Sequence, residues 1–250
     1  MARRVLLRAA LFAVTLLIAL LVLAPASLLG IAVEHASKGD LTLTESTGTL
    51  WHGRGVIVGM RSGARAPVEW RVNSANLFPP TINISVSLNS SNPVNLSIGS
   101  ASVTLTNAEI TVPAELIADV LPAARAYKLA GQVRLQSSRL QLEQDRATGT
   151  VLVNWRNATS AWIAVAPLGA YDIRCDFTGA SGAATLSTVS GPLLASGHAQ
   201  WSDTSSSARI TARATGPQAT PLKAWLTAIA VEQPDGAFQF TSPATGANAR

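Results

Sequence analysis

Alternation of apolar and polar residues is the dominant pattern along this chain. Its clearest instance runs over residues 81–89, where every second side chain from Ile82 to Leu88 is aliphatic and the others are Asn or Ser. Strict alternation is typical of strands that bury one face and expose the other. Because the stretches are short and separated by Gly, Asn, Ser or Pro, they predict an antiparallel meander. The same alternation recurs at residues 40–44, 94–98, 103–105, 133–135, 140–142, 172–177 and 210–214.

Two later stretches have helical periodicity instead. Residues 113–120 begin with a proline, carry Glu115 in the first turn and end near Pro122. Residues 220–231 begin with a Thr-Pro pair that suits a helix cap and first position. Their apolar residues fall on one helical face, at Leu222, Trp225, Leu226 and Ile229. Both predicted helices are short, and we expect each to cover an edge or an end of a sheet.

The N-terminus departs from the alternation, because Ala9–Val33 is an uncharged apolar run. A run of 25 residues is long enough to cross a bilayer core as a helix. Arg3, Arg4 and Arg8 precede it, which predicts a cytoplasmic N-terminus over residues 1–8. The pattern therefore predicts a single-pass chain, with a transmembrane anchor at residues 9–33 and everything after Val33 on the far side of the membrane.

A cleaved signal peptide is the alternative for this segment. Residues 24–27, Ala-Pro-Ala-Ser, could serve as a cleavage region. The apolar part of a signal peptide is usually about 7–15 residues long, however. Here the apolar run continues over residues 28–33, beyond that region, and this favours a retained anchor.

Composition excludes several classes for the part after Val33. All 14 acidic residues and 16 of the 19 Lys and Arg residues lie there, so this part is nearly neutral and its bases form no run. A nucleic-acid-binding surface is therefore not expected. The single cysteine, Cys175, excludes a disulfide scaffold. It falls on the apolar side of an alternating stretch, where a buried structural role is expected.

The chain also has features of an internal duplication. The segments around Trp70 and Trp155 resemble each other, and each predicted helix leads to a Gly-x-apolar-x-apolar stretch. This predicts two β-rich units, at residues 34–130 and 131–240, each with a short helix. Such a sheet could be curved or groove-like. Residues 241–250 are small and polar, and we expect a disordered tail there.

Signals for catalysis are weak. No histidine has a second ligand at metal-binding spacing, and no Gly-x-Ser-x-Gly elbow occurs. The glycines from Gly53 to Gly59 do not have dinucleotide-loop spacing, and a strand with close backbone contacts is the better interpretation. Asp172 and Asp176 share a strand face, but alternation places it in solvent. The sequence thus predicts no enzyme, no cofactor and no catalytic or metal-binding residue.

Three glycine-containing motifs stand out instead. The first surrounds Trp51 with glycines, which permits close backbone approach or a bulge beside the ring. The other two combine Gly with Pro, as turns between strands do. Together with the strand that carries Trp70, the motif residues are Gly48, Thr49, Leu50, Trp51 and Gly53, then Pro167, Leu168, Gly169 and Tyr171, and finally Gly191 and Pro192.

These motifs, in this order after an N-terminal anchor, resemble protein N of the bacterial type II (general) secretion pathway. The resemblance implies an inner-membrane protein with a periplasmic β-rich domain. It further implies a part in the machinery that exports folded periplasmic proteins across the outer membrane. The family offers no catalytic residues to carry over, so the motif residues are candidates for partner binding or for structure.

Two hypotheses for function follow. In the first, the chain is a non-catalytic scaffold or accessory subunit that contacts other secretion subunits through sheet edges or around Trp51. In the second, the sheet is a periplasmic groove that binds lipid or another hydrophobic ligand. The apolar stripes of residues 81–89 and 94–98 would then form its floor.

Overall fold

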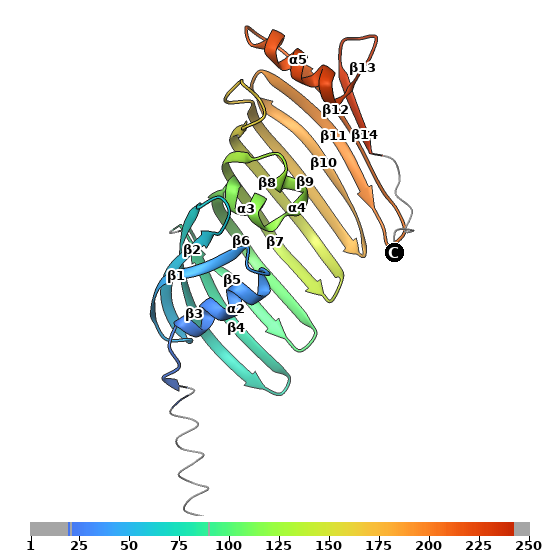
Figure 1. The fold of residues 1–250 in the computed structure, drawn as a ribbon. Coiled ribbons are helices and arrows are strands. Elements are labelled where there is room, and N and C mark those ends of the chain that lie inside the picture. Colours follow the sequence, from blue (N-terminus) through green and yellow to red (C-terminus); the bar gives the residue numbers. More distant parts are fainter. Residues whose placement is uncertain (1–19, 21, 90, 243–250) are drawn as a thin grey trace, which may run out of the picture.

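The computed structural model describes residues 20, 22–89 and 91–242, which form one antiparallel sheet with helices on one side (Figure 1). Spatial order follows chain order from β1 to β12, and β14 and then β13 complete the sheet. The prediction of a mainly β, antiparallel fold is confirmed. The strands are β1 (Leu41–Gly48), β2 (His52–Gly59), β3 (Arg65–Leu77), β4 (Pro80–Leu88), β5 (Val94–Gly99), β6 (Ser102–Pro113), β7 (Leu129–Glu143), β8 (Arg146–Ser160), β9 (Gly169–Gly179), β10 (Ser181–Ser190), β11 (Leu193–Trp201), β12 (Ser206–Ala214), β13 (Val231–Glu232) and β14 (Phe238–Ser242).

Strand register gives the sheet one apolar and one polar face. Directly paired residues on β6 to β12 and β14 form an apolar row of Ile110, Leu135, Val153, Ile173, Leu186, Gly197, Ile210 and Phe240. One residue away, on the opposite face, the row is Glu109, Gln136, Leu152, Arg174, Thr185, His198, Arg209 and Thr241. The alternation read from the sequence therefore becomes two faces of opposite character.

Four short helices are described: α2 (Ser27–Ala36), α3 (Ala114–Val120), α4 (Pro122–Arg125) and α5 (Ala219–Ile229). Three of them pack on the apolar face. Leu29 of α2 contacts a cluster around Trp70, and Leu116 of α3 packs near Val112. The largest cluster lies under α5, where Leu222 and Leu226 have no exposed surface.

The apolar face remains partly open away from these helices. Ile82 on β4 is 40% exposed, and Leu142 on β7 is 38% exposed. Both lie near hairpin tips, in line with aliphatic residues of neighbouring strands. A second layer would bury such side chains almost completely. In this region the described chain is thus a single layer.

The predicted helices are found with small shifts in their ends. The helix predicted at residues 113–120 is α3, and the one at 220–231 is α5. Pro113 precedes α3 in an extended conformation, and Val231, the last residue of the second prediction, instead begins β13. Helix α2 was not predicted as a separate helix, because residues 27–33 lie in the apolar run that was interpreted as the anchor. Helix α4 was not predicted because it has only four residues.

In the described part of the expected anchor, Ala9–Val33, the chain is not one continuous helix. Pro25 forms a β-bridge with Thr49, and α2 begins only at Ser27. Proline has no amide hydrogen and interrupts a continuous helix. Residues 27–33 therefore belong to a helix that packs on the sheet. Within the described residues, none of the helices has the length and apolar character that a membrane crossing requires. Residues 1–19 and 21 of the expected cytoplasmic segment and anchor lie outside them.

The boundary between the two predicted units runs through a continuous ladder. Strand β7 starts at that boundary and pairs with β6 over Ser102–Pro113 on one side and with β8 on the other. The described strands therefore form one sheet, while the duplication itself stays a prediction. Thr241 and Ser242, which were expected to belong to the tail, are part of β14. Residues 243–250 lie outside the described part.

Candidate functional site

The motif around Trp51 forms the turn between β1 and β2 and holds an earlier segment of the chain. The amide of Ala26 donates to the carbonyl of Gly48 at 3.2 Å, and the amide of Leu50 donates to the carbonyl of Ala24 at 2.8 Å. Residues 24–26 thus lie beside the end of edge strand β1 like a short added strand. We call this pairing of residues 24–26 with residues 48–50 the entry clamp.

Glycines make the entry clamp possible because side chains would collide there. Gly48 has a φ of +98°, and a Cβ on it would lie 2.5 Å from the carbonyl oxygen of His52. A Cβ on Gly53 would lie 2.6 Å from the indole of Trp70. That indole is 8% exposed and donates its Nε1–H to the carbonyl of Thr49 at 3.2 Å. The spacing of glycines around an aromatic residue therefore reflects close packing.

Trp51 itself lies at the surface of this turn and is half-buried. Its amide donates to Thr49 Oγ1 at 3.3 Å, and its carbonyl accepts from the amide of Val72 at 2.7 Å. The backbone of Trp51 is thus fixed by neighbouring strands, and its ring retains some contact with solvent. Leu50 is also half-buried.

The two Gly-Pro motifs meet at the opposite end of the strands, between β8 and β11. Gly169 and Gly191 have φ values of +154° and +125°, and a Cβ on Gly191 would overlap the Cα of Gly169. Leu168 is 4% exposed, and its carbonyl accepts from the amide of Leu193 at 3.1 Å. Pro167 follows a cis peptide bond, and Pro192 accepts a backbone hydrogen bond from Thr215. The motifs thus form one interlocked corner.

The buried side chain of Tyr171 packs against this corner and bonds to its backbone. Its ring is 4% exposed and lies 5.8 Å, centroid to centroid, from the ring of Trp155. Its hydroxyl donates to the carbonyl of Leu193 at 2.9 Å and lies 3.3 Å from that of Leu168. Burial raises the pKa of Tyr171 to about 12. The hydroxyl is therefore a structural donor at neutral pH.

The two carboxylates that share a strand face, Asp172 and Asp176, are both held in polar contacts. Asp172 accepts from Asn154 at 2.9 Å and pairs with Arg156 at 3.1 Å. Hydrogen bonds from Arg174 and then from Thr150 lower the pKa of Asp176. Carboxylates held in such polar pairs suit surface structure better than proton transfer.

Metal and thiol chemistry are also without a site in the described part of the chain. No group of three or more His, Cys, Asp or Glu side chains that could hold a metal ion occurs among the residues described. Cys175 is half-buried on the apolar face. Burial, and secondarily the charge of Asp176, raises the pKa of its thiol. A raised pKa reduces the reactive thiolate fraction at neutral pH.

Comparison with protein families identifies a match to the type II secretion system (T2SS), protein N, over residues 39–241. The chain belongs to this family. The resemblance inferred from the sequence motifs is thereby confirmed. A search of curated proteins and a search of solved structures find no match. Membership of the T2SS protein N family connects the chain with type II secretion and with its machinery of interacting subunits.

The motifs of this T2SS protein N chain do not converge on one site. Gly48, Thr49, Leu50, Trp51, Gly53 and Trp70 gather at the β1 edge, and Pro167, Leu168, Gly169, Tyr171, Gly191 and Pro192 gather at the corner between β8 and β11. Both sets have clear packing roles in the structure. Partner binding by any of them stays a prediction.

A polar network near α3 is absent from the sequence-based prediction. Asp119 is 4% exposed and accepts from the amide and the hydroxyl of Ser62, at 3.2 and 2.6 Å. Arg125 donates to the carbonyl of Asp119 and pairs with Asp40 at 2.8 Å. A Cβ at Gly59 would overlap the Asp119 carboxylate. In the sequence, Gly59 indicated a position of close contact. No residue near it in the sequence indicated that Asp119 is the neighbour.

Replacing Gly191 by Ala should destabilise the fold far more than replacing Gly216 by Ala. Both glycines have positive φ, at +125° and +74°, but no atom lies within 4 Å of a Cβ built at Gly216. We expect Gly216→Ala to cost about 1–2 kcal/mol for the backbone conformation. Gly191→Ala should cost about 1–3 kcal/mol more for overlap with Gly169. Urea unfolding of the purified variants measures both, and equal losses would contradict the interlocked corner.

Replacing Tyr171 by Phe should lower stability in a pH-dependent way. The variant leaves the Leu193 carbonyl without this donor, at a cost of about 1–3 kcal/mol. Because the folded pKa of Tyr171 is raised to about 12, the stabilisation is complete below pH 10 and is lost as pH rises through about 12. The stability gap between wild type and Tyr171→Phe should therefore narrow from pH 10 to 12.

Tyr127→Phe is the matched control, because Tyr127 is 56% exposed. Its effect on the free energy of unfolding should be small at neutral pH. If the Tyr171→Phe gap stays constant between pH 10 and 12, the buried hydroxyl does not stabilise the corner by donating to the Leu193 carbonyl.

Proposed function

We propose that this T2SS protein N chain is a non-catalytic scaffold or accessory subunit, anchored in the inner membrane, with its sheet in the periplasm. The apolar residues ahead of Pro25 serve as the anchor, and Arg3, Arg4 and Arg8 keep its start in the cytoplasm. The entry clamp is the observation that carries the proposal. It binds the segment directly after these apolar residues to the first edge of the sheet.

The proposed contact with other secretion subunits is at strand β1. Strand β1 is the first strand in the sheet and therefore an edge strand. Within the described residues, its outer side makes hydrogen bonds only near the two ends of the strand. Ser37 Oγ contacts the backbone of Leu41, and the entry clamp holds Gly48. Between them, the outward backbone groups can accept a strand from another chain. The opposite edge offers less, because β13 has only two residues. Trp51 adds a half-buried aromatic surface beside this edge.

Photocrosslinking in intact cells tests this proposal. A photoreactive amino acid in place of exposed Glu45 or His52 should capture other subunits of the secretion machinery. The same amino acid in place of Val189, which is 52% exposed on β10, is the control for nonspecific capture. If neither Glu45 nor His52 captures a secretion subunit, and deletion of the gene leaves export unchanged, the scaffold role is wrong.

A second function, binding of lipid or another hydrophobic ligand, is favoured by one observation. The apolar face is continuous across the sheet, and near Ile82 and Leu142 it remains exposed. Aliphatic side chains lie next to one another on adjacent strands there, as in the pair Leu105 and Leu140. A lipid acyl chain placed along such a row would bury apolar surface on both partners.

Lipid extraction and mass spectrometry of the purified protein test this second function. Phospholipid should copurify in near-stoichiometric amounts with the wild-type chain and decrease in Leu142→Glu. Leu152→Glu is the matched control, because Leu152 is 39% exposed, close to the 38% of Leu142, but lies on the polar face. A wild-type chain free of lipid, or equal lipid in both variants, would argue against a groove.

A further inference from the structure

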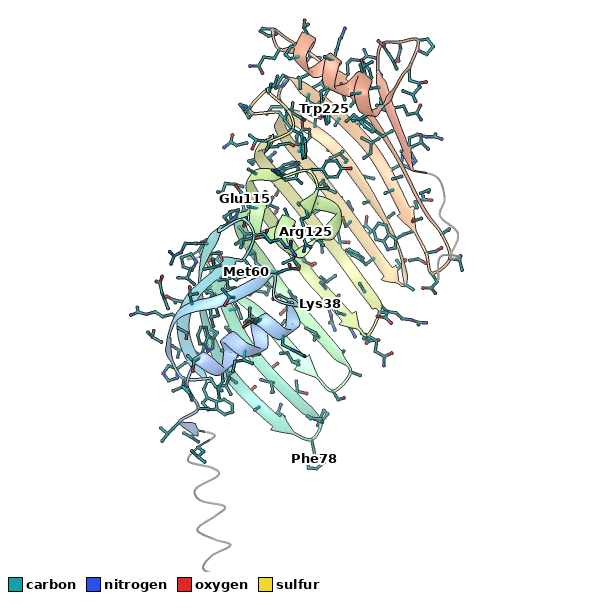
Figure 2. All side chains as sticks on the ribbon, viewed as in Figure 1. Lys38, Met60, Phe78, Glu115, Arg125 and Trp225 are labelled. Atoms are coloured by element: carbon teal, nitrogen blue, oxygen red, sulfur yellow. The ribbon has the colours of Figure 1, made fainter. Side chains whose placement is uncertain are left out.

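Phe78 is the most exposed large apolar side chain in the described part of the chain, at 95%. It lies at the tip of the β3–β4 hairpin, followed by Pro79 and Pro80. Figure 2 shows this tip at the lower end of the sheet, the end at which the described chain begins. Three further exposed apolar residues lie at that beginning: Leu20 at 63%, Val22 at 55% and Leu23 at 72%.

The hairpin tips at this end of the sheet lie at different distances from the start of the described chain. Because the meander alternates in direction, the connections β1–β2, β3–β4, β5–β6, β7–β8, β9–β10 and β11–β12 share one end of the strands. In Figure 1 the later tips step progressively away from the start of the described chain. The β3–β4 tip is therefore placed to reach a surface near that start, and the β11–β12 tip is farthest from it.

The chemistry of the tips changes along the same direction. The β3–β4 tip is Phe-Pro-Pro, whereas the β7–β8 tip carries Asp145 and the β11–β12 tip carries Asp203. Near the β1–β2 turn, His52 pairs in register with Arg71, which lies six residues before the end of β3, and residues 72–82 around the Phe-Pro-Pro tip carry no charge. Arg54, two residues after His52 on β2, pairs in register with Glu69. An exposed aromatic residue on an uncharged tip suits the interface of a bilayer, whereas an acidic tip is repelled by an anionic bilayer.

We propose that the β3–β4 tip inserts Phe78 into the phospholipid surface of the membrane that holds the anchor. The inference rests on the proposed anchor, because the anchor brings this end of the sheet to the bilayer. The entry clamp connects the anchor to the edge of the sheet, and the Phe78 tip contacts the bilayer. Together they fix the angle between the sheet and the membrane. The later tips rise from the membrane, and the corner between β8 and β11 stands away from it.

Fluorescence quenching by lipids tests this contact in the full-length chain. In a Cys175→Ser background, single cysteines replace Phe78, Asp145, Asp203 or Thr15 and carry an environment-sensitive dye. The chain is reconstituted into vesicles of phosphatidylethanolamine and phosphatidylglycerol that contain nitroxide-labelled lipid. A tip that enters the outer 5–10 Å of a bilayer should be quenched at least about threefold more strongly than tips held in water.

The label at Thr15 distinguishes the proposed anchor from the proposed contact of Phe78 with the bilayer. Strong quenching at 15 and 78, with little at 145 and 203, supports both the anchor and the Phe78 contact. Quenching at 15 alone overturns the Phe78 contact and leaves the anchor intact. If neither 15 nor 78 is quenched, both proposals are wrong, and quenching at 78 without 15 supports surface contact but rejects the anchor. Melting temperatures equal to that of the background chain show that each labelled variant is folded.

Discussion

Backbone hydrogen bonding between consecutive strands is the constraint on which the rest of this protein depends. The described chain has no second sheet against which to pack, so the ladder must align the apolar residues of 14 strands on one face. A register slip of one residue would turn a strand's aliphatic side chains into solvent. Short helices can cover parts of the sheet only because this alignment is maintained from β1 to β14.

Local irregularities preserve the alignment where the sequence would break it. On β6, Leu105 and Ile110 are an odd number of residues apart, yet both belong to the apolar face. Asn107, which has a φ of +51°, interrupts the alternation on β6, while the pairing with β7 keeps one register from Thr106–Arg139 to Ala108–Ser137. The register between β7 and β8 shifts in the same region, between Gln136 and Leu140. At this shift Ser137 is buried and its hydroxyl donates to the carbonyl of Thr150 at 2.7 Å. The polar residue thus compensates for the interrupted ladder.

The sequence was most informative where a pattern had a short period. Alternation at residues 81–89 and the 3–4 spacing at Leu222 and Leu226 were enough for strands and a helix, because burial of one face determines both. The motif glycines were recognised as sites of close approach, but not their partners. Gly191 contacts Gly169, and Gly59 contacts Asp119. In each pair the two residues are distant in sequence, and only the order of the strands in the sheet brings them together. The break at Pro25 was hidden by uniform hydrophobicity, since an apolar residue can face lipid or pack on a sheet.

The strict meander order has a consequence for how the chain can fold. From β1 to β11, every strand pairs only with its neighbours in sequence, so each new hairpin extends a ladder that already exists. Contacts of this kind close short loops and form quickly. A chain whose segments become available in sequence order can therefore build its sheet progressively, before the later strands are present. Only β14, which must pass β13 and join β12 beneath α5, requires the end of the chain to be present.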